Sequence, residues 1–192
     1  MRFLGRANKK IAIVYQGGFG HTEKLAHLVE KGAKEVQNAE TFLIELDDKT
    51  ADWTLLEKAD AIIFGSPTYN GTVSARFKQF MEDSTGPAFV EQKWRNKIAA
   101  GFTNSGAEHG DKLNSLITMS LFAAQHAMIW VNLGLLSGKT RKDLNGIGSW
   151  LGAMAQSDNA SPDVTPKIED LNTAKYLGHH VAEITKQFCN GK

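Results

Sequence analysis

A continuous apolar run passes directly into a glycine-rich loop in the segment Ile11-Ala12-Ile13-Val14-Tyr15-Gln16-Gly17-Gly18-Phe19-Gly20-His21-Thr22. An apolar run without alternation is typical of a strand that helices cover on both faces. Behind the loop, Leu25, Leu28 and Val29 have helical spacing and predict an amphipathic helix. The segment therefore predicts a strand, a tight loop and a helix, which is the repeating unit of α/β proteins.

The same unit recurs along the chain. Further apolar runs of strand length, rich in Ile, Val and Phe, lie at 41–46, 61–64, 98–102 and 128–133. Because strands and helices alternate with mostly short connections, we expect an α/β fold, namely an open, doubly wound, five-stranded parallel sheet with helices on both faces. Ligands bind such sheets beyond the carboxyl ends of the strands.

Helices are expected between most of these strands. One is predicted near 73–81 and one near the C-terminus over 171–188. Residues 53–58 are a candidate for a short helix that Asp52 would cap, with irregular structure as the alternative. A further helix is predicted after Asp111, another candidate cap. Its stripe at helical spacing is expected to face the sheet and consists of Leu113, Leu116, Ile117, Ser120, Leu121 and Ala124.

Length and composition favour one domain spanning residues 1–192. The chain has 22 basic and 21 acidic residues and a formal net charge of +1, so neither a nucleic-acid surface nor an anionic membrane surface is expected. A single cysteine, Cys189, excludes an internal disulfide. No apolar run has the length of a signal peptide or a membrane span, and we expect a cytoplasmic protein.

The segment 134–166 is long and has no clear periodicity. It contains five glycines and two prolines. Compact domains rarely carry idle loops of this length, so a lid or a subunit contact is expected, with plain disorder as the alternative.

The first loop has the features of a phosphate-binding site. Its glycines allow backbone N–H groups to approach an anion, Thr22 adds a hydroxyl, and the following helix presents its positive end. An ordinary strand-to-helix turn is the alternative. The residues predicted to hold the anion are Gly17, Gly18, Phe19, Gly20, His21 and Thr22.

Two more polar, glycine-bearing loops follow strands of the same sheet. In the second loop Tyr69 offers an aromatic face to a flat ligand, and Asn70-Gly71 permits left-handed backbone. Three such loops at one sheet edge predict a single site. Its further candidate residues are Pro67, Thr68, Tyr69, Asn70 and Gly71 from the second loop, and Thr103, Asn104, Ser105, Gly106, Ala107, Glu108, His109 and Gly110 from the third.

Several of these motifs resemble those of flavodoxin-like FMN proteins, and among them the WrbA-type NAD(P)H:quinone oxidoreductases. The resemblance covers nearly the whole chain. It rests on segments 15–23, 65–80 and 102–110, on His126, and on Ala174-Lys175-Tyr176-Leu177-Gly178.

The resemblance implies the sheet order 2-1-3-4-5. It also implies that 17–22 hold the phosphate of FMN and that 67–71 and 103–110 border its ring. NADH or NADPH would be the electron donor and a quinone or similar small molecule the acceptor. Members of the family form homodimers and homotetramers, for which Trp150, Leu151 and Met154 are candidate contacts here.

His126 is expected, through the resemblance, to face the open side of the ring and to act on the quinone. The alternative is a structural histidine, since it lies between an apolar helix and an apolar strand. The sequence departs from the family at Gly17, where a serine is typical, at Tyr69, where arginine is frequent, and at Phe89 in place of an overhanging tryptophan.

No metal site is predicted, because Glu23 and His27 have the spacing of an ordinary solvated pair. The leading hypothesis is an FMN-dependent enzyme that transfers two electrons from NAD(P)H to a quinone. One alternative is a one-electron carrier of the flavodoxin type, which the near-neutral charge disfavours because such carriers are usually acidic. The other is a regulatory binding module with weak affinity for FMN.

Overall fold

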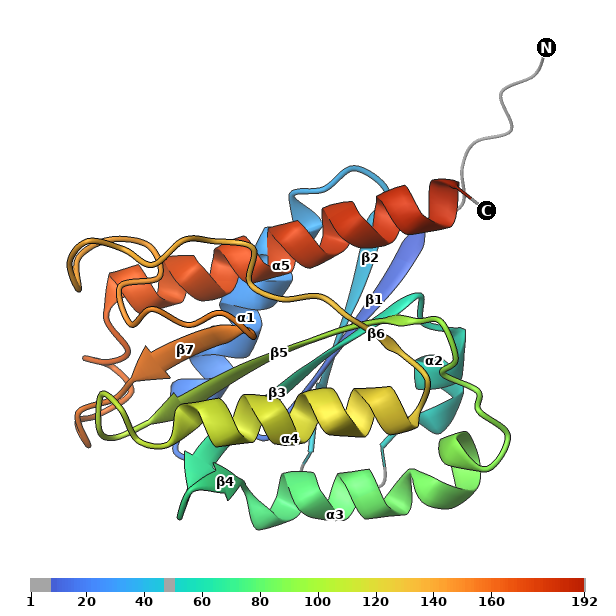
Figure 1. Cartoon of the computed structure of the whole chain (residues 1–192), viewed down its shortest axis with the longest axis horizontal. Helices are drawn as coiled ribbons and strands as arrows, with labels where there is room; N and C mark the ends of the chain where they lie inside the picture. Colours follow the sequence, from blue (N-terminus) through green and yellow to red (C-terminus); the bar gives the residue numbers. More distant parts are fainter. Residues whose placement is uncertain (1–7, 47–50, 192) are drawn as a thin grey trace.

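A parallel sheet forms the centre of the molecule in a computed structural model that describes residues 8–46 and 51–191. Its main path has the order β2-β1-β3-β5-β6, with β4 paired to β3 and β7 paired to β5 (Figure 1). The strands are β1 (Lys9–Tyr15), β2 (Ala39–Glu45), β3 (Ala61–Tyr69), β4 (Thr72–Val73), β5 (Ile98–Ser105), β6 (Ile129–Trp130) and β7 (Ala153–Gln156).

Helices cover both faces of this sheet. On one face α1 (His21–Lys34) packs against α5 (Ile168–Asn190). On the other face lie α2 (Trp53–Lys58), α3 (Ala75–Asp83) and α4 (Lys112–Gln125), with a short π-helical turn at Thr85–Phe89 after α3 (Figure 1). The predicted doubly wound α/β class is confirmed.

The two faces explain why the strands lack alternation. In β1, Ile11 and Ile13 belong to the core beneath α1 and α5, whereas Ala12 and Val14 belong to the core above α3 and α4. Successive side chains of a strand point to opposite faces, so a strand with helices on both sides must be apolar at every position. These residues are all 0% exposed.

The predicted strand order is confirmed, but the fifth strand differs from the expectation of 128–133. It is interrupted, because β6 keeps two residues and the sheet edge is continued by β7, which pairs with the carboxyl half of β5 from Phe102↔Ala153 to Ser105↔Gln156. The chain between the two pieces leaves the sheet and returns. The long segment 134–166 therefore contains a strand, and the sheet has seven strands instead of five.

Hydrogen bonds inside this segment hold it in place. The buried Asn145 donates to the carbonyls of Leu135, Leu136 and Ser149 and accepts from the Ser149 amide. The alternative of plain disorder is thus not what the structure shows. Met154, a predicted subunit contact, is instead a core residue at 9% exposure, because it lies on β7.

The prediction of which α4 side chains face the sheet was partly wrong. Leu113, Ile117 and Leu121 are 52%, 38% and 62% exposed, and the buried side chains include Leu116, Met119 and Phe122. This helix is apolar on more than one side, so several stripes satisfy the spacing and the pattern does not select the face that meets the sheet.

Two helices begin at a residue whose side chain caps them, and a third does not. Asp52 accepts from the amide of Leu55 at 2.9 Å and caps α2 as predicted, and Ser74 accepts from the amide of Phe77 and caps α3. Val73, expected in that helix, lies in β4. Asp111 precedes α4 but makes no side-chain cap, because it lies in a left-handed conformation with φ 52°. No helix within 8–46 and 51–191 is both long and apolar enough to span a membrane.

Candidate functional site

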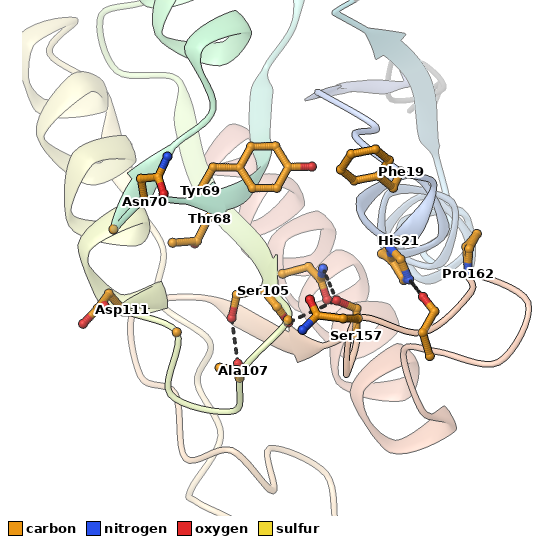
Figure 2. Close-up of a pocket in the computed structure, with 16 residues that line it drawn as sticks. Phe19, His21, Thr68, Tyr69, Asn70, Ser105, Ala107, Asp111, Ser157 and Pro162 are labelled. Atoms are coloured by element: carbon orange, nitrogen blue, oxygen red, sulfur yellow. Dashed lines mark hydrogen bonds between the residues drawn. The ribbon is translucent and has the colours of Figure 1, made fainter.

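A pocket of about 870 Å³ opens at the carboxyl end of the sheet, where the three predicted loops meet. Its size is that of pockets which enclose small molecules and cofactors. Figure 2 shows Tyr69 and Phe19 facing each other across one side and Ser105, Ala107 and Ser157 on another. The lining residues are Phe19, His21, Thr68, Tyr69, Asn70, Gly71, Asn104, Ser105, Gly106, Ala107, Gly110, Asp111, Ser157, Asn159, Ala160 and Pro162.

The first wall is the amino end of α1. Gly20 is its N-cap with φ 94°, a conformation that glycine adopts without strain, and no side chain caps the helix. The first N–H groups of an α-helix have no partner within the helix. This end of α1 therefore presents backbone donors and the positive end of the helix dipole, which together favour an anion.

The second wall follows β3. Thr68 Oγ1 lies 2.8 Å from Thr103 Oγ1 and 2.7 Å from Ser115 Oγ, so buried hydroxyls join β3, β5 and α4 beneath the pocket. Above them the ring of Tyr69 meets the ring of Phe19 edge to face, with centroids 6.3 Å apart. Burial raises the pKa of the Tyr69 hydroxyl above its ordinary value.

The third wall is the end of β5 and the loop after it. Asn104 is 5% exposed, and its Nδ2 donates to Ser157 Oγ at 3.3 Å. Its Oδ1 is buried without a hydrogen-bond partner among the described residues. A buried acceptor left unpaired is costly, so a pocket ligand that donates a hydrogen bond would satisfy it.

A fourth wall comes from residues 157–162, and sequence reasoning missed it. His21 Nε2 lies 2.8 Å from the carbonyl oxygen of Ala160, and Lys24 Nζ donates to the carbonyl of Pro162. The Ser157 amide donates to the Ser105 carbonyl at 2.9 Å. This part of the long segment is thereby fixed to both α1 and β5. The absence of periodicity in 134–166 pointed to a functional segment, but not to these residues.

Most of the predicted residues line the pocket, and the others lie in the strands beside it, in the first loop or the first turn of α1, or at the surface of the third loop. Pro67 and Thr103 lie within paired strands, and Thr22 is 1% exposed on the core side of α1. Glu108 points to Arg141, and the side chain of His109 is 89% exposed. The predicted residues that line the pocket are Phe19, His21, Thr68, Tyr69, Asn70, Gly71, Asn104, Ser105, Gly106, Ala107 and Gly110; those that do not are Gly17, Gly18, Gly20, Thr22, Pro67, Thr103, Glu108 and His109.

His126 is not at this site. It follows the carboxyl end of α4, whereas the pocket lies at the amino end, and a helix of this length spans about 21 Å. The side chain is 1% exposed, contacts the rings of Trp94 and Phe122, and has Nε2 3.0 Å from Ser84 Oγ. Within one chain these contacts match the structural alternative, and the catalytic role of His126 stays a prediction. Phe89 packs on His126 and likewise does not line the pocket.

Burial lowers the pKa of His126 to about 4 from an ordinary 6.5. The His126 side chain is protonated near pH 6.5 in the unfolded chain but only near pH 4 in the folded protein. The stabilisation that neutral His126 allows is therefore fully present above pH 6.5 and is lost as the pH falls from 6.5 to 4. We expect His126 to account for a loss on the order of 2 kcal/mol over that range.

Urea unfolding of the parent and of His126→Asn at pH 7, 5.5 and 4.5 measures this difference. The variant is expected to lack the part of the acid-induced loss in the free energy of unfolding that His126 contributes. Equal acid sensitivity of the variant and the parent would contradict this account of His126.

No group of three or more His, Cys, Asp or Glu side chains in the described part of the chain is placed to hold a metal ion. Glu23 and His27 are the exposed pair that the spacing suggested, with Oε1 and Nε2 3.9 Å apart.

Comparison with known proteins agrees with this geometry. Residues 10–142 match the family described as NADPH-dependent FMN reductase. The chain is 39% identical to the flavodoxin FldP of Pseudomonas aeruginosa, over 93% of this chain and 97% of that protein. It is 34% identical to an NAD(P)H dehydrogenase (quinone) of Archaeoglobus fulgidus, over 94% of this chain and 99% of that protein.

Among solved structures, the flavodoxin-type WrbA-like protein of Agrobacterium tumefaciens superposes with a TM-score of 0.75 at 35% identity. The superposition covers 94% of this chain and 99% of that one. The fold is therefore shared over nearly the full length of both chains.

Proposed function

The chain belongs to the NADPH-dependent FMN reductase family, and from this premise we propose that it is an FMN-dependent oxidoreductase of the NAD(P)H:quinone type. The overall reaction is NAD(P)H plus quinone plus a proton, giving NAD(P)⁺ and quinol. Two electrons leave the nicotinamide as a hydride and arrive on the quinone, whose oxygens also take up protons. Bound FMN supplies the group that accepts the hydride and passes on the electrons.

The residues present fit FMN at each of its parts. The uncapped amino end of α1 suits a phosphate dianion, and the pocket volume suits the rest of the molecule. Gly106 also lines the pocket, and a Cβ there would overlap the side chain of Asn159, so this glycine allows Asn159 to lie close against the third loop. The observation that carries the proposal is the unpaired buried oxygen of Asn104, because it offers a pocket ligand an acceptor for a hydrogen bond.

The residues around the pocket would bind FMN and position its ring. Residues 17–22 would hold the phosphate, the segment 67–71 would border one side of the ring, and 103–110 would border the other. Residues 157–162, held by hydrogen bonds from His21 and Lys24, would exclude water from the phosphate end. Tyr69 adds an aromatic surface for a flat acceptor.

A one-electron carrier is the second candidate, favoured by the 39% identity to a flavodoxin. The near-neutral charge disfavours it, since carriers steered to their partners usually carry a strong charge of one sign. The two proposals differ in whether the pocket admits a nicotinamide donor directly.

One spectroscopic experiment tests the proposal. Protein loaded with FMN is kept without oxygen and followed by visible absorbance while NADH, then NADPH and finally benzoquinone are added. Loss of the oxidised-flavin absorbance with either nucleotide, and its return with the quinone, is expected. A bound flavin that neither nucleotide reduces would favour the carrier, and failure to bind FMN would favour the regulatory module.

We further propose a homodimer or homotetramer. Leu136 and Trp150 are 81% and 59% exposed in the segment between β6 and β7, and large exposed apolar side chains are typical of interfaces. Light scattering after size exclusion measures the mass directly. A monomer at every concentration would contradict this proposal.

A further inference from the structure

The first residue of α4 is a lysine whose side chain is buried under the third wall of the pocket. Lys112 is 1% exposed. Burial of an ammonium group is costly unless hydrogen bonds and opposite charges compensate. A cation at the amino end of a helix also meets the positive end of the helix dipole. The contacts that offset these costs therefore show what this side chain does.

Those contacts are with the loop that lines the pocket. Lys112 Nζ donates hydrogen bonds to the carbonyl oxygens of Ala107, at 3.2 Å, and of Glu108, at 2.6 Å. Ser105 Oγ donates to the same Ala107 carbonyl at 2.8 Å. The loop then turns through Gly110 and Asp111, both left-handed with φ 52°. The ammonium group thus lies inside the turn and sets the direction of its carbonyls.

A second layer of charges surrounds this contact. Arg141 Nε lies 2.8 Å from Glu108 Oε1, and the same guanidinium bonds both oxygens of the buried Asp170 at 3.0 and 3.2 Å. The amide of Gln156 also donates to Asp170, at 3.0 Å. The loop after β5 is thereby connected to the long segment, to β7 and to the start of α5.

The signs of these charges balance. Lys112 and Arg141 are opposite Glu108 and Asp170. Asp158, whose charge also acts on Lys112, has Lys167 Nζ 3.9 Å away, so these charges balance while Lys112 is protonated. Loss of the lysine charge would leave a net negative charge beside a pocket whose proposed ligand is itself an anion, and like charges repel strongly where water is scarce.

Resting on the proposed function, we infer that Lys112 is a positioning residue for FMN. It holds the carbonyls of Ala107 and Glu108, and so fixes the wall 106–110 that faces the ring, while its charge neutralises the carboxylates behind that wall. Lys112 itself does not line the pocket, so it acts through the loop.

The main variant is Lys112→Met, which keeps much of the side-chain volume and removes both the donor and the charge. Titration of the apoprotein with FMN is expected to show a dissociation constant 10- to 100-fold higher, roughly the loss of a charged hydrogen-bond contact. Lys78→Met removes a lysine whose side chain is 55% exposed and is expected to bind as the parent does. Equal affinity of the Lys112 variant and the parent would overturn the inference.

Two readouts separate positioning from general stability. Lys112→Gln keeps a neutral donor and is expected to recover part of the affinity, and it serves as the test if the methionine variant does not fold. Hydrogen exchange of the amides 106–110, measured without FMN, is expected to be faster in Lys112→Met. This second readout does not depend on the proposed function, whose failure would show separately as a parent that does not bind FMN.

A pH profile gives a further test. Burial lowers the pKa of Lys112 to about 8, against the attraction of Asp170, Glu108 and Asp158 and together with the repulsion of Arg141. As pH rises through 8 the cluster becomes negative, and the dissociation constant of FMN for the parent is expected to rise. Lys112→Met should show no such rise between pH 7 and 9. Identical profiles of the two proteins would contradict the role of the charge.

Discussion

Replacement of Gly178 by alanine is expected to lower the free energy of unfolding by about 3 kcal/mol, the upper end for an overpacked core. Gly178 lies on α5 where this helix crosses α1. A Cβ at Gly178 would overlap the carbonyl oxygen of Val29, and a Cβ at Gly32 of α1 would overlap the carbonyl of Lys175. The two glycines let the backbones touch, and a backbone atom cannot move aside as a side chain can.

The helices would have to separate, which opens the core that α1 and α5 share with the sheet. Alanine favours a helix over glycine by about 1 kcal/mol, and this gain offsets only part of the loss. For a chain of this length the expected change corresponds to a melting temperature roughly 10 °C lower.

Urea unfolding of Gly178→Ala against the parent measures the effect. The matched control is Gly86→Ala, since no atom lies within 4 Å of a Cβ built there, and a change within about 0.5 kcal/mol is expected. The double alanine variant at Gly32 and Gly178 should lose less free energy of unfolding than the two single variants lose together. One separation of the helices relieves both contacts. A single variant as stable as the parent would refute this account of the packing.

Replacement of Gly20 by alanine is expected to raise the dissociation constant of FMN about 10- to 100-fold, because a side chain at this left-handed position costs about 1–3 kcal/mol. Gly20 has φ 94°, and a Cβ there would lie 3.2 Å from two side-chain atoms of Pro162. Relief of the strain moves the amino end of α1 and residues 157–162 apart. Both are proposed to enclose the phosphate.

Comparison of FMN with riboflavin makes this test specific to the phosphate. The parent is expected to prefer FMN, and Gly20→Ala to lose much of that preference. Gly148→Ala is the matched control, because Gly148 also has a positive φ, of 80°, and lies outside the pocket. If Gly20→Ala keeps the full preference for FMN, the phosphate is not held at the amino end of α1.

Local patterns were enough for the class of fold. Successive strand positions are apolar, as at Ile11, Val14 and Ile63, because helices cover both faces of the sheet. Strand ends were less predictable, since β3 continues to Tyr69 and β5 to Ser105 through polar residues. These ends are ordered by pairing with each other, from Gly65↔Phe102 to Pro67↔Asn104, which no local pattern contains.

The charge cluster beneath the pocket was also outside the reach of local reasoning. Lys112, Arg141 and Asp170 are far apart along the chain, and each alone resembles a solvated surface residue. Their burial depends on how the long segment packs against α4 and α5. The same applies to Leu113, Ile117 and Leu121, whose exposure depends on how α4 is rotated against the sheet.

The alternation of apolar runs with amphipathic helices, and the three glycine-bearing loops after strands, follow from the sequence, because strand and helix periodicity and the freedom of glycine are local properties. The fourth wall at 157–162, the placement of His126 at the end of α4 opposite the pocket and the burial of Lys112 follow from tertiary structure. Each of these depends on contacts between residues distant in the chain, whose energies arise only when the sheet, α4 and the long segment pack together.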